Sequence, residues 1–191
     1  VLIFTSGINI FILLAFFCLA IILLTYLIIY VPKFDYIQGR ILSFFDRETG
    51  THNFQSDKAI DSITSGGFFG KGIGEGILKN RVPEAHTDYI ISVISEEFGV
   101  VAIMLILLLF LIFIYMVFKK ISFETDDKTK LILIGSISLI LMQATIHIGV
   151  NIRLFPTTGM TLPFLSYGGS SIISTSILAG IILNLTKRKI N

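Results

Sequence analysis

The residues best suited to chemistry are acids gathered just before a long apolar run, in the segment RVPEAHTDYIISVISEEFGV (residues 81–100). In a helix that starts near Pro83, Glu84 and Asp88 lie four residues apart on one face, where like charges repel each other. Asp88 could simply suit the helix dipole, with Thr87 as the cap. A desolvated carboxylate could instead serve as a general base, or the pair could hold a divalent cation. The spacing leaves these three interpretations open.

Other polar residues lie within the apolar runs. Glu96 and Glu97 fall about two helical turns into one run, so they lie either inside a membrane, at a cost of several kcal/mol unless they are paired or hydrated, or at its surface. Gln143, His147 and Asn151 recur every four residues and therefore share one helical face. This face favours hydrogen bonds between helices, so we expect His147 to be a buried structural partner rather than a catalyst.

The elements that position these residues are predicted to be membrane helices. The chain has 191 residues, of which 53% are hydrophobic and 15% charged, and its mean hydropathy is +0.85. A helix needs about 20 apolar residues to cross a bilayer, and backbone exposed to lipid must satisfy its own hydrogen bonds. We therefore predict an all-α, polytopic transmembrane bundle that forms a single membrane region, with spans over residues 8–31, 90–118, 131–150 and 170–185.

The basic residues beside the spans predict an orientation. Short cytoplasmic loops of membrane proteins are enriched in Lys and Arg. If each run crosses once, one face carries the basic residues near the ends of the last three runs, and we expect this face and the C-terminus to be cytoplasmic: Lys119, Lys120, Lys128, Lys130, Lys187, Arg188 and Lys189. The loops of residues 32–89 and 151–169 then lie outside. The net charge of +2 favours no nucleic-acid partner.

Both outer loops have distinctive local sequences. In the first, residues 55–64 are predicted to form a short helix, and the glycine-rich residues 66–76 are interpreted as a flexible loop. This stretch is not a phosphate-binding loop, because its lysine is not followed by Ser or Thr and no strand precedes it. In the second loop, Pro156 and Pro163 prevent a continuous helix, so we expect a loop that returns into the bundle.

Two long motifs resemble one known family. GGFFGKGIGEG followed by VPEAHTDYIISVISEEFG, and then PTTGMTLPFLSYGGSS, are similar to motifs of the SEDS family (shape, elongation, division and sporulation) in the same order. The motif with Thr161 resembles the division branch of the family, whereas Thr158, in place of the usual lysine of that branch, resembles the elongation branch. Family members span the membrane ten times, so the resemblance implies that this chain is the C-terminal part of such a protein.

The resemblance also implies an activity and partners. It implies a peptidoglycan glycosyltransferase that polymerises lipid II, the undecaprenyl-pyrophosphate-linked disaccharide peptide, at the outer face of the bacterial plasma membrane during cell division. The implied partners are a class B penicillin-binding protein and other proteins of the division machinery.

Site residues follow from the same resemblance. Asp88 corresponds to the catalytic aspartate and is expected to act as general base, with Glu84 and His86 in support. Glu84 and Asp88 could hold Mg²⁺ or Mn²⁺, and no organic cofactor is implied. Five further residues are expected to bind or support the substrate: Lys71, His147, Arg153, Thr158 and Ser166.

Two other classes of function remain open. A lipid II flippase or another transporter would use the polar face of Gln143, His147 and Asn151, and these residues would then matter more than Asp88. A non-catalytic scaffold of the division machinery, or an inactive truncated remnant, would need none of this chemistry.

Overall fold

A computed structural model describes residues 9–45, 51–76 and 85–187 of the chain. The described elements are helices, and four of them are long and apolar enough to cross a membrane: α2 (Ile10–Tyr30), α5 (Ile90–Phe123), α6 (Asp127–Asn151) and α7 (Gly169–Thr186). The predicted all-α, polytopic fold is thereby confirmed. The chain divides into two compact units, residues 1–53 and 54–191, which are described separately.

The first unit consists of α2 and a shorter helix that the sequence analysis missed. The side chain of Asn9 accepts a hydrogen bond from the backbone N–H of Phe11, 3.0 Å away, and so caps α2. After α2, a 3₁₀ turn (Pro32–Phe34) leads into α3 (Asp35–Phe45). Pro32 at the start of the turn and the acidic Asp35 in the first turn of α3 favour helical structure there.

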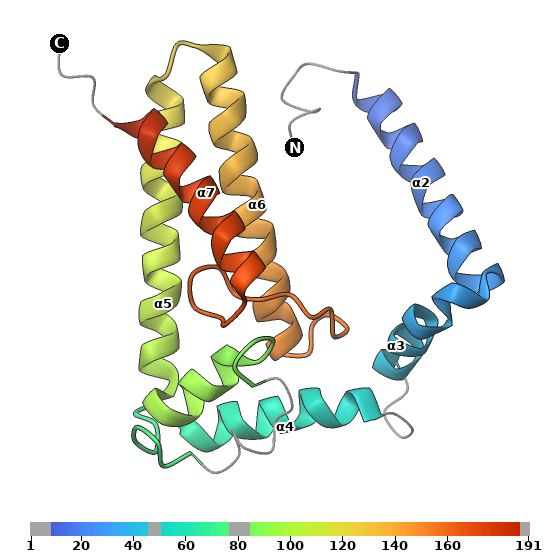
Figure 1. Ribbon diagram of the computed structural model, residues 1–191, viewed down its shortest axis with the longest axis vertical. Coiled ribbons are helices and arrows are strands. Elements are labelled where there is room, and N and C mark those ends of the chain that lie inside the picture. The colour runs from blue at the N-terminus through green and yellow to red at the C-terminus, as the bar shows by residue number, and fades with distance from the viewer. Residues whose placement is uncertain (1–8, 46–50, 77–84, 188–191) are drawn as a thin grey trace. The chain divides into compact units, whose positions relative to one another are not determined.

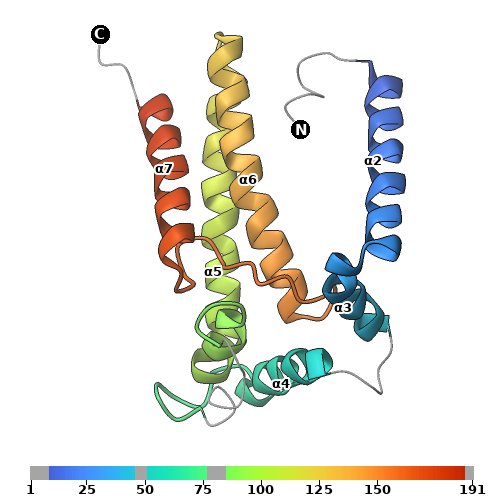
Figure 2. The ribbon, with the colours of Figure 1, turned by 45° about the vertical axis from the view of Figure 1, so that its right-hand side comes forward.

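In the second unit, α5, α6 and α7 form an antiparallel bundle (Figures 1 and 2). Its apolar core consists of buried side chains from all three helices, namely Val117, Leu133, Ile137, Ile140 and Ile182. The end of α5, the start of α6 and the end of α7 meet at one end of this bundle (Figure 1). Residues 85–89 lie at the other end, whereas the end where the three helices meet carries the described members of the basic set predicted to be cytoplasmic: Lys119, Lys120, Lys128, Lys130 and Lys187. Arg188 and Lys189 lie outside the described residues.

The helix α5 is broken at Gly99, whose φ of 77° and ψ of −176° are not helical. The glycine-rich loop (residues 66–76) supplies the hydrogen bonds that the break removes. Carbonyl groups of Gly67 and Phe68 accept from Val100 and Val101 at 2.9 and 3.3 Å, and the carbonyl of Glu96 accepts from Lys71 at 2.9 Å. The interpretation of this segment as a flexible loop is therefore wrong, because its backbone is docked on α5.

The helix α4 (Thr51–Gly66) packs against the start of α5 and contains the predicted helix of residues 55–64, which is confirmed. The hydroxyl groups of Ser56 and Tyr89 lie 3.3 Å apart, and Ser95 donates to the carbonyl oxygen of Ile63 at 3.3 Å. Around these contacts a second apolar cluster joins α4, α5 and α6: Ala59, Ala85, Tyr89, Val93 and Val150. This packing fixes the turn that carries Asp88.

Candidate functional site

Asp88 lies in the turn of residues 85–89, immediately before α5, and is half-buried. The helix expected from about Pro83 is not there among the described residues, since α5 begins at Ile90. The N-cap of α5 is Tyr89, and no side chain caps it, so the interpretation of Thr87 as a cap is wrong. The position of Asp88 depends instead on contacts with α6 and with the loop of residues 152–168.

The first of these contacts comes from Asn151, the last residue of α6. Its side-chain nitrogen donates to the carbonyl oxygens of Asp88 and His147, each at 2.9 Å, and lies 3.4 Å from Nδ1 of His147. Both side chains are fully buried. The prediction that His147 is a buried structural partner is confirmed, and the pair connects α6 to the backbone of Asp88.

The second contact comes from Ser166, in the loop between α6 and α7. Its hydroxyl group donates to the carbonyl oxygen of Thr87 at 2.7 Å and accepts from the backbone N–H of Leu162 at 2.8 Å. The next residue, Tyr167, donates its backbone N–H to the carbonyl oxygen of His86 at 3.0 Å. The loop expected to return into the bundle therefore holds both residues that precede Asp88.

The same loop approaches the carboxylate of Asp88 at Gly159. This glycine has a φ of 69°, in the left-handed region, and a Cβ placed there would lie 3.6 Å from Oδ2 of Asp88. The neighbouring Thr158 is exposed. The structure thus brings Gly159 of the PTTG segment next to the candidate base, and a role for Thr158 stays a prediction.

Gln143 of α6 donates hydrogen bonds to this loop and to the start of α7. Its side-chain nitrogen donates to the carbonyl oxygen of Thr161 at 3.0 Å and to the hydroxyl of Ser171 at 3.0 Å. The hydroxyl of Thr161 in turn donates to that of Ser171 at 2.6 Å. All three members of the polar face on α6 therefore make internal hydrogen bonds, as the interhelical interpretation predicts.

An open pocket lies beside the turn. It has a volume of about 400 Å³ and is lined by His86, Ile90, Leu165 and Tyr167. Leu165 also lines an apolar pocket of about 320 Å³ against α5, together with Phe110 and other apolar residues. Two largely apolar pockets therefore share Leu165 within a few residues of the carboxylate of Asp88, an arrangement that suits a ligand with an apolar part.

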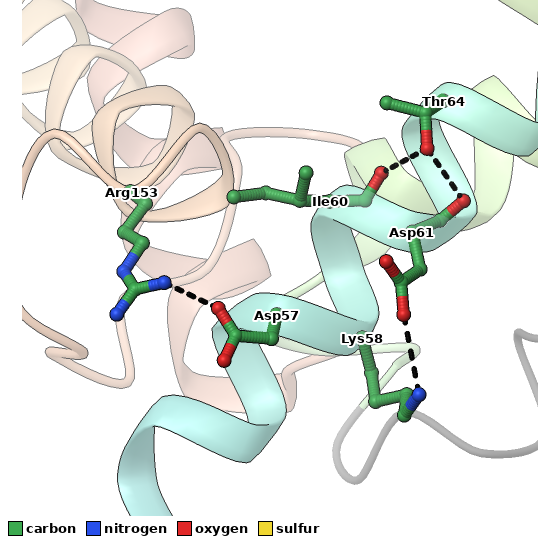
Figure 3. Close-up of polar contacts among 6 residues, drawn as sticks. All are labelled: Asp57, Lys58, Ile60, Asp61, Thr64 and Arg153. Carbon is green, nitrogen blue, oxygen red and sulfur yellow. Dashed lines mark hydrogen bonds and ion pairs between the residues drawn. The ribbon is translucent and has the colours of Figure 1, made fainter. Parts of the chain in front are cut away.

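Two of the predicted site residues form ion pairs away from this turn. Arg153 pairs with Asp57 of α4 (Figure 3). Lys71 lies 3.5 Å from Oε1 of Glu96, whose carboxylate is fully buried. Arg153 thus joins the α6–α7 loop to α4, and Lys71 joins the glycine-rich loop to α5.

A metal site is not formed by the described residues alone. Among them, no group of three or more His, Cys, Asp or Glu side chains could hold a metal ion. Glu84, predicted as a ligand and as support for Asp88, lies outside the described residues. Of the two residues predicted to bind a metal ion, Glu84 and Asp88, the structure therefore describes Asp88 alone.

Sequence reasoning missed the positioning roles of Asn151 and Gly159. The four-residue spacing identified the face to which Asn151 belongs, but it could not reveal that its partner is a carbonyl group 63 residues away. Gly159 lies within the motif PTTGMTLPFLSYGGSS, and a glycine in a loop can indicate that the backbone lies close to another group.

Comparisons with known proteins agree with the motifs. The family model described as "Cell cycle protein", named for FtsW, RodA and SpoVE, matches residues 1–191. A probable peptidoglycan glycosyltransferase FtsW from Caulobacter vibrioides is 37% identical over 158 residues, covering 82% of this chain and 40% of that protein. One from Nitrosomonas europaea is 34% identical over 188 residues, covering 95% of this chain and 48% of that protein.

A solved structure agrees as well. A chain in the structure described as "Structural coordination of polymerization and crosslinking by a peptidoglycan synthase complex" is similar with a TM-score of 0.75 and 26% identity. The match covers all of this chain and 53% of that one. The chain spans less than half the length of both FtsW relatives. It is a multi-pass membrane protein that belongs to the SEDS family, the cell cycle proteins that include FtsW, RodA and SpoVE.

Proposed function

We propose that the protein containing residues 1–191 is a peptidoglycan glycosyltransferase that polymerises lipid II into glycan strands during cell division. The observation that carries this proposal is the position of Asp88. Its neighbours His86 and Ile90 line an open pocket. Its backbone is held by Asn151 at the end of α6 and, through Thr87, by Ser166 of the loop between α6 and α7. The names of the FtsW relatives and the similarity to a chain of a peptidoglycan synthase complex support the same activity.

In the proposed reaction Asp88 is the general base. Its carboxylate accepts the proton of the 4-hydroxyl group of the acceptor sugar, and the oxygen attacks the anomeric carbon of the donor. The new glycosidic bond forms as the bond from that carbon to the lipid pyrophosphate breaks, and the pyrophosphate leaves with the bonding electrons. The fixed backbone of Asp88 contributes by holding the carboxylate in one position relative to the bound sugar.

The surrounding residues take supporting roles. His86 lines the pocket beside the turn and is proposed to contact the sugar, while Ser166 and His147 act through the backbone that they support. Thr158 adjoins the carboxylate through Gly159. Binding of pyrophosphate by Lys71 or Arg153 stays a prediction, because each cation would first have to leave its carboxylate.

A divalent cation also stays a prediction. Mg²⁺ or Mn²⁺ would neutralise charge on the leaving pyrophosphate, with Asp88, Glu84 or the substrate oxygens as ligands. Removal of divalent ions with a chelator should then abolish polymerisation, and added Mg²⁺ or Mn²⁺ should restore it. Unchanged glycan synthesis by chelator-treated protein would exclude the requirement.

The proposed location is the bacterial plasma membrane, with the C-terminus in the cytoplasm. The lysines near the ends of α5, α6 and α7 support this orientation, because cytoplasmic loops are enriched in basic residues. Asp88 and Glu96 are then at the outer surface, where the helix break at Gly99 also lies. The proposed partners are a class B penicillin-binding protein and other division proteins, which the similarity to a synthase complex supports in general.

The competing functions make different predictions in one experiment. The full-length protein is reconstituted into liposomes with labelled lipid II and its penicillin-binding partner, and both glycan product and movement of lipid II between leaflets are measured. The polymerase hypothesis predicts glycan strands. Movement of lipid II without glycan product would support the transporter, and neither activity in protein that still binds its partner would support the scaffold or the inactive remnant.

A further inference from the structure

The tip of the glycine-rich loop carries large apolar side chains that the chain itself does not cover. Phe68, Phe69 and Ile73 are 74%, 85% and 79% exposed. The tip is nevertheless ordered by its backbone, since Gly70 has a φ of 76° and a Cβ there would meet the carbonyl oxygen of Glu97 at 2.1 Å. Large apolar side chains exposed together on an ordered loop indicate an interaction site.

Hydrogen bonds to α5 fix the position of this tip along the axis of that helix. The backbone N–H groups of Val100 and Val101 donate to the carbonyl oxygens of Gly67 and Phe68 at 2.9 and 3.3 Å. Val100 and Val101 begin the apolar part of α5, whose exposed side chains continue with Met104 and Leu105. The tip is therefore level with the first turn of α5 after the break at Gly99.

The hydrogen bonds at the helix break are also those that a lipid environment demands. A non-helical residue such as Gly99 frees carbonyl groups before it and N–H groups after it. The loop pairs with both sets, because Lys71 and Gly72 donate to the carbonyls of Glu96 and Glu97, and Gly67 and Phe68 accept on the other side. Irregular backbone at membrane depth persists only where its polar groups are satisfied within the protein.

The charge of the tip fits the same environment. Residues 67–74 contain one charged side chain, that of Lys71, which turns back to the buried carboxylate of Glu96. The tip is apolar, and the charge of Lys71 is neutralised by Glu96. Both features suit a loop that enters the region between lipid headgroups and acyl chains.

We propose that Phe68, Phe69 and Ile73 insert into the outer-leaflet interface of the bilayer and anchor the glycine-rich loop beside the start of α5. We assign lipid rather than a protein to this surface, because the tip continues, at the same depth, the exposed apolar surface of α5, a helix long and apolar enough to cross a membrane. The anchor is independent of the proposed enzymatic activity, since it depends on the path of the backbone and on α5 spanning the membrane, and its assignment to the outer leaflet rests on the orientation proposed above.

Tryptophan fluorescence tests the anchor directly, because the chain contains no tryptophan. The variant Phe69→Trp is made in the full-length protein, and emission from any tryptophan outside residues 1–191 is measured in the parent and subtracted. In bilayers, its emission should shift to short wavelength, lose intensity with lipids brominated near the headgroup end of the acyl chain, and resist quenching by aqueous iodide. Ile73→Trp should behave in the same way and serves if the first variant does not fold.

Two control variants calibrate the depth. Leu108→Trp, on an exposed site in the middle of α5, should be quenched by lipids brominated deep in the acyl chain, and Asp61→Trp, on the exposed face of α4, should be quenched by iodide. If the tip variants match Asp61→Trp, the proposal is overturned. Protection from iodide without any quenching by brominated lipid also overturns it, since the tip would then be covered by protein.

Discussion

The side-chain amide nitrogen of Asn151 donates hydrogen bonds to two backbone carbonyl groups, those of Asp88 and His147. Asn151→Ala removes this donor in a buried site, where each unsatisfied group costs about 1–3 kcal/mol. We expect a lower melting temperature and a larger fall in the rate of glycan synthesis than the loss of folded protein explains. Both are measured on the full-length protein at equal folded amounts.

The matched control for this variant is Asn184→Ala, at an exposed position near the end of α7. It should change neither the melting temperature nor the rate. A polymerisation rate of Asn151→Ala equal to that of the parent would contradict the role assigned to the amide.

The second residue-scale prediction concerns Gly159, whose backbone conformation is restricted and whose Cβ position is in contact with Asp88. Gly159→Ala places a side chain at a φ of 69°, which costs about 1–2 kcal/mol, and puts its methyl carbon in van der Waals contact with Oδ2 of Asp88, 3.6 Å away. We expect reduced kcat, because relief of the backbone strain would shift the loop that contacts the carboxylate. Gly180→Ala, in α7 with open space around its Cβ position, should keep the parental rate, and an equally mild effect at Gly159 would show that the PTTG loop does not constrain Asp88.

At the scale of elements, the docking of the glycine-rich loop predicts different effects for two glycines. Gly70 and Gly74 both have positive φ, at 76° and 82°, so alanine is strained at either position. A Cβ at Gly70 would also meet the carbonyl oxygen of Glu97 at 2.1 Å, whereas at Gly74 there is nothing within 4 Å. Gly70→Ala should therefore lower the melting temperature clearly more than Gly74→Ala, and equal shifts in thermal unfolding would argue against docking.

The start of α6 gives a pH-dependent prediction. The side-chain hydroxyl and the backbone N–H of Thr129 both donate to the carboxylate of Asp126, which keeps the pKa of Asp126 below its usual value of 3.8. Because the folded-state pKa is lowered, these hydrogen bonds stabilise the folded protein fully above pH 3.8, and this stabilisation is lost as the pH falls through the folded-state pKa.

Asp126→Ala should therefore lower the melting temperature at neutral pH, and the difference from the parent should shrink in acid. Asp126→Asn is the control, since asparagine also caps a helix but does not titrate in this range. It should retain most of the stability at neutral pH without the acid dependence at this site. A destabilisation by Asp126→Ala that does not change with pH would contradict the assigned hydrogen bonds.

The elements differ in how far the sequence predicts them. The four spans were predicted because a long apolar run has few alternatives in a bilayer, and the helix of residues 55–64 follows from its local pattern. The break at Gly99 and the docked loop could not be predicted, because they depend on hydrogen bonds between residues about 30 positions apart in the chain. The many glycines in residues 66–76 indicated an unusual backbone conformation, but they did not indicate that this loop pairs with α5.

Within the second unit, the candidate base and one group of lysines lie at opposite ends of the bundle. Lys119, Lys120, Lys128 and Lys130 lie where α5 ends and α6 begins, whereas the backbone of Asp88 is bonded to the last residue of α6 (Figure 1). The resemblance of two motifs to one family predicts that Asp88, His86, Thr158 and Ser166 belong to one site. The three elements that assemble this site meet only in the folded bundle, so the sequence could not supply its geometry.

The most direct test of the central claim compares full-length parent and Asp88→Asn in polymerisation of lipid II, with the class B penicillin-binding partner present. Asp61→Asn, an exposed acid on α4, is the matched control. Loss of a general base should lower the rate by about 100-fold or more, with folding and partner binding retained, while Asp61→Asn keeps the parental rate. Undiminished glycan synthesis by folded Asp88→Asn would contradict the assignment of Asp88 as the catalytic base.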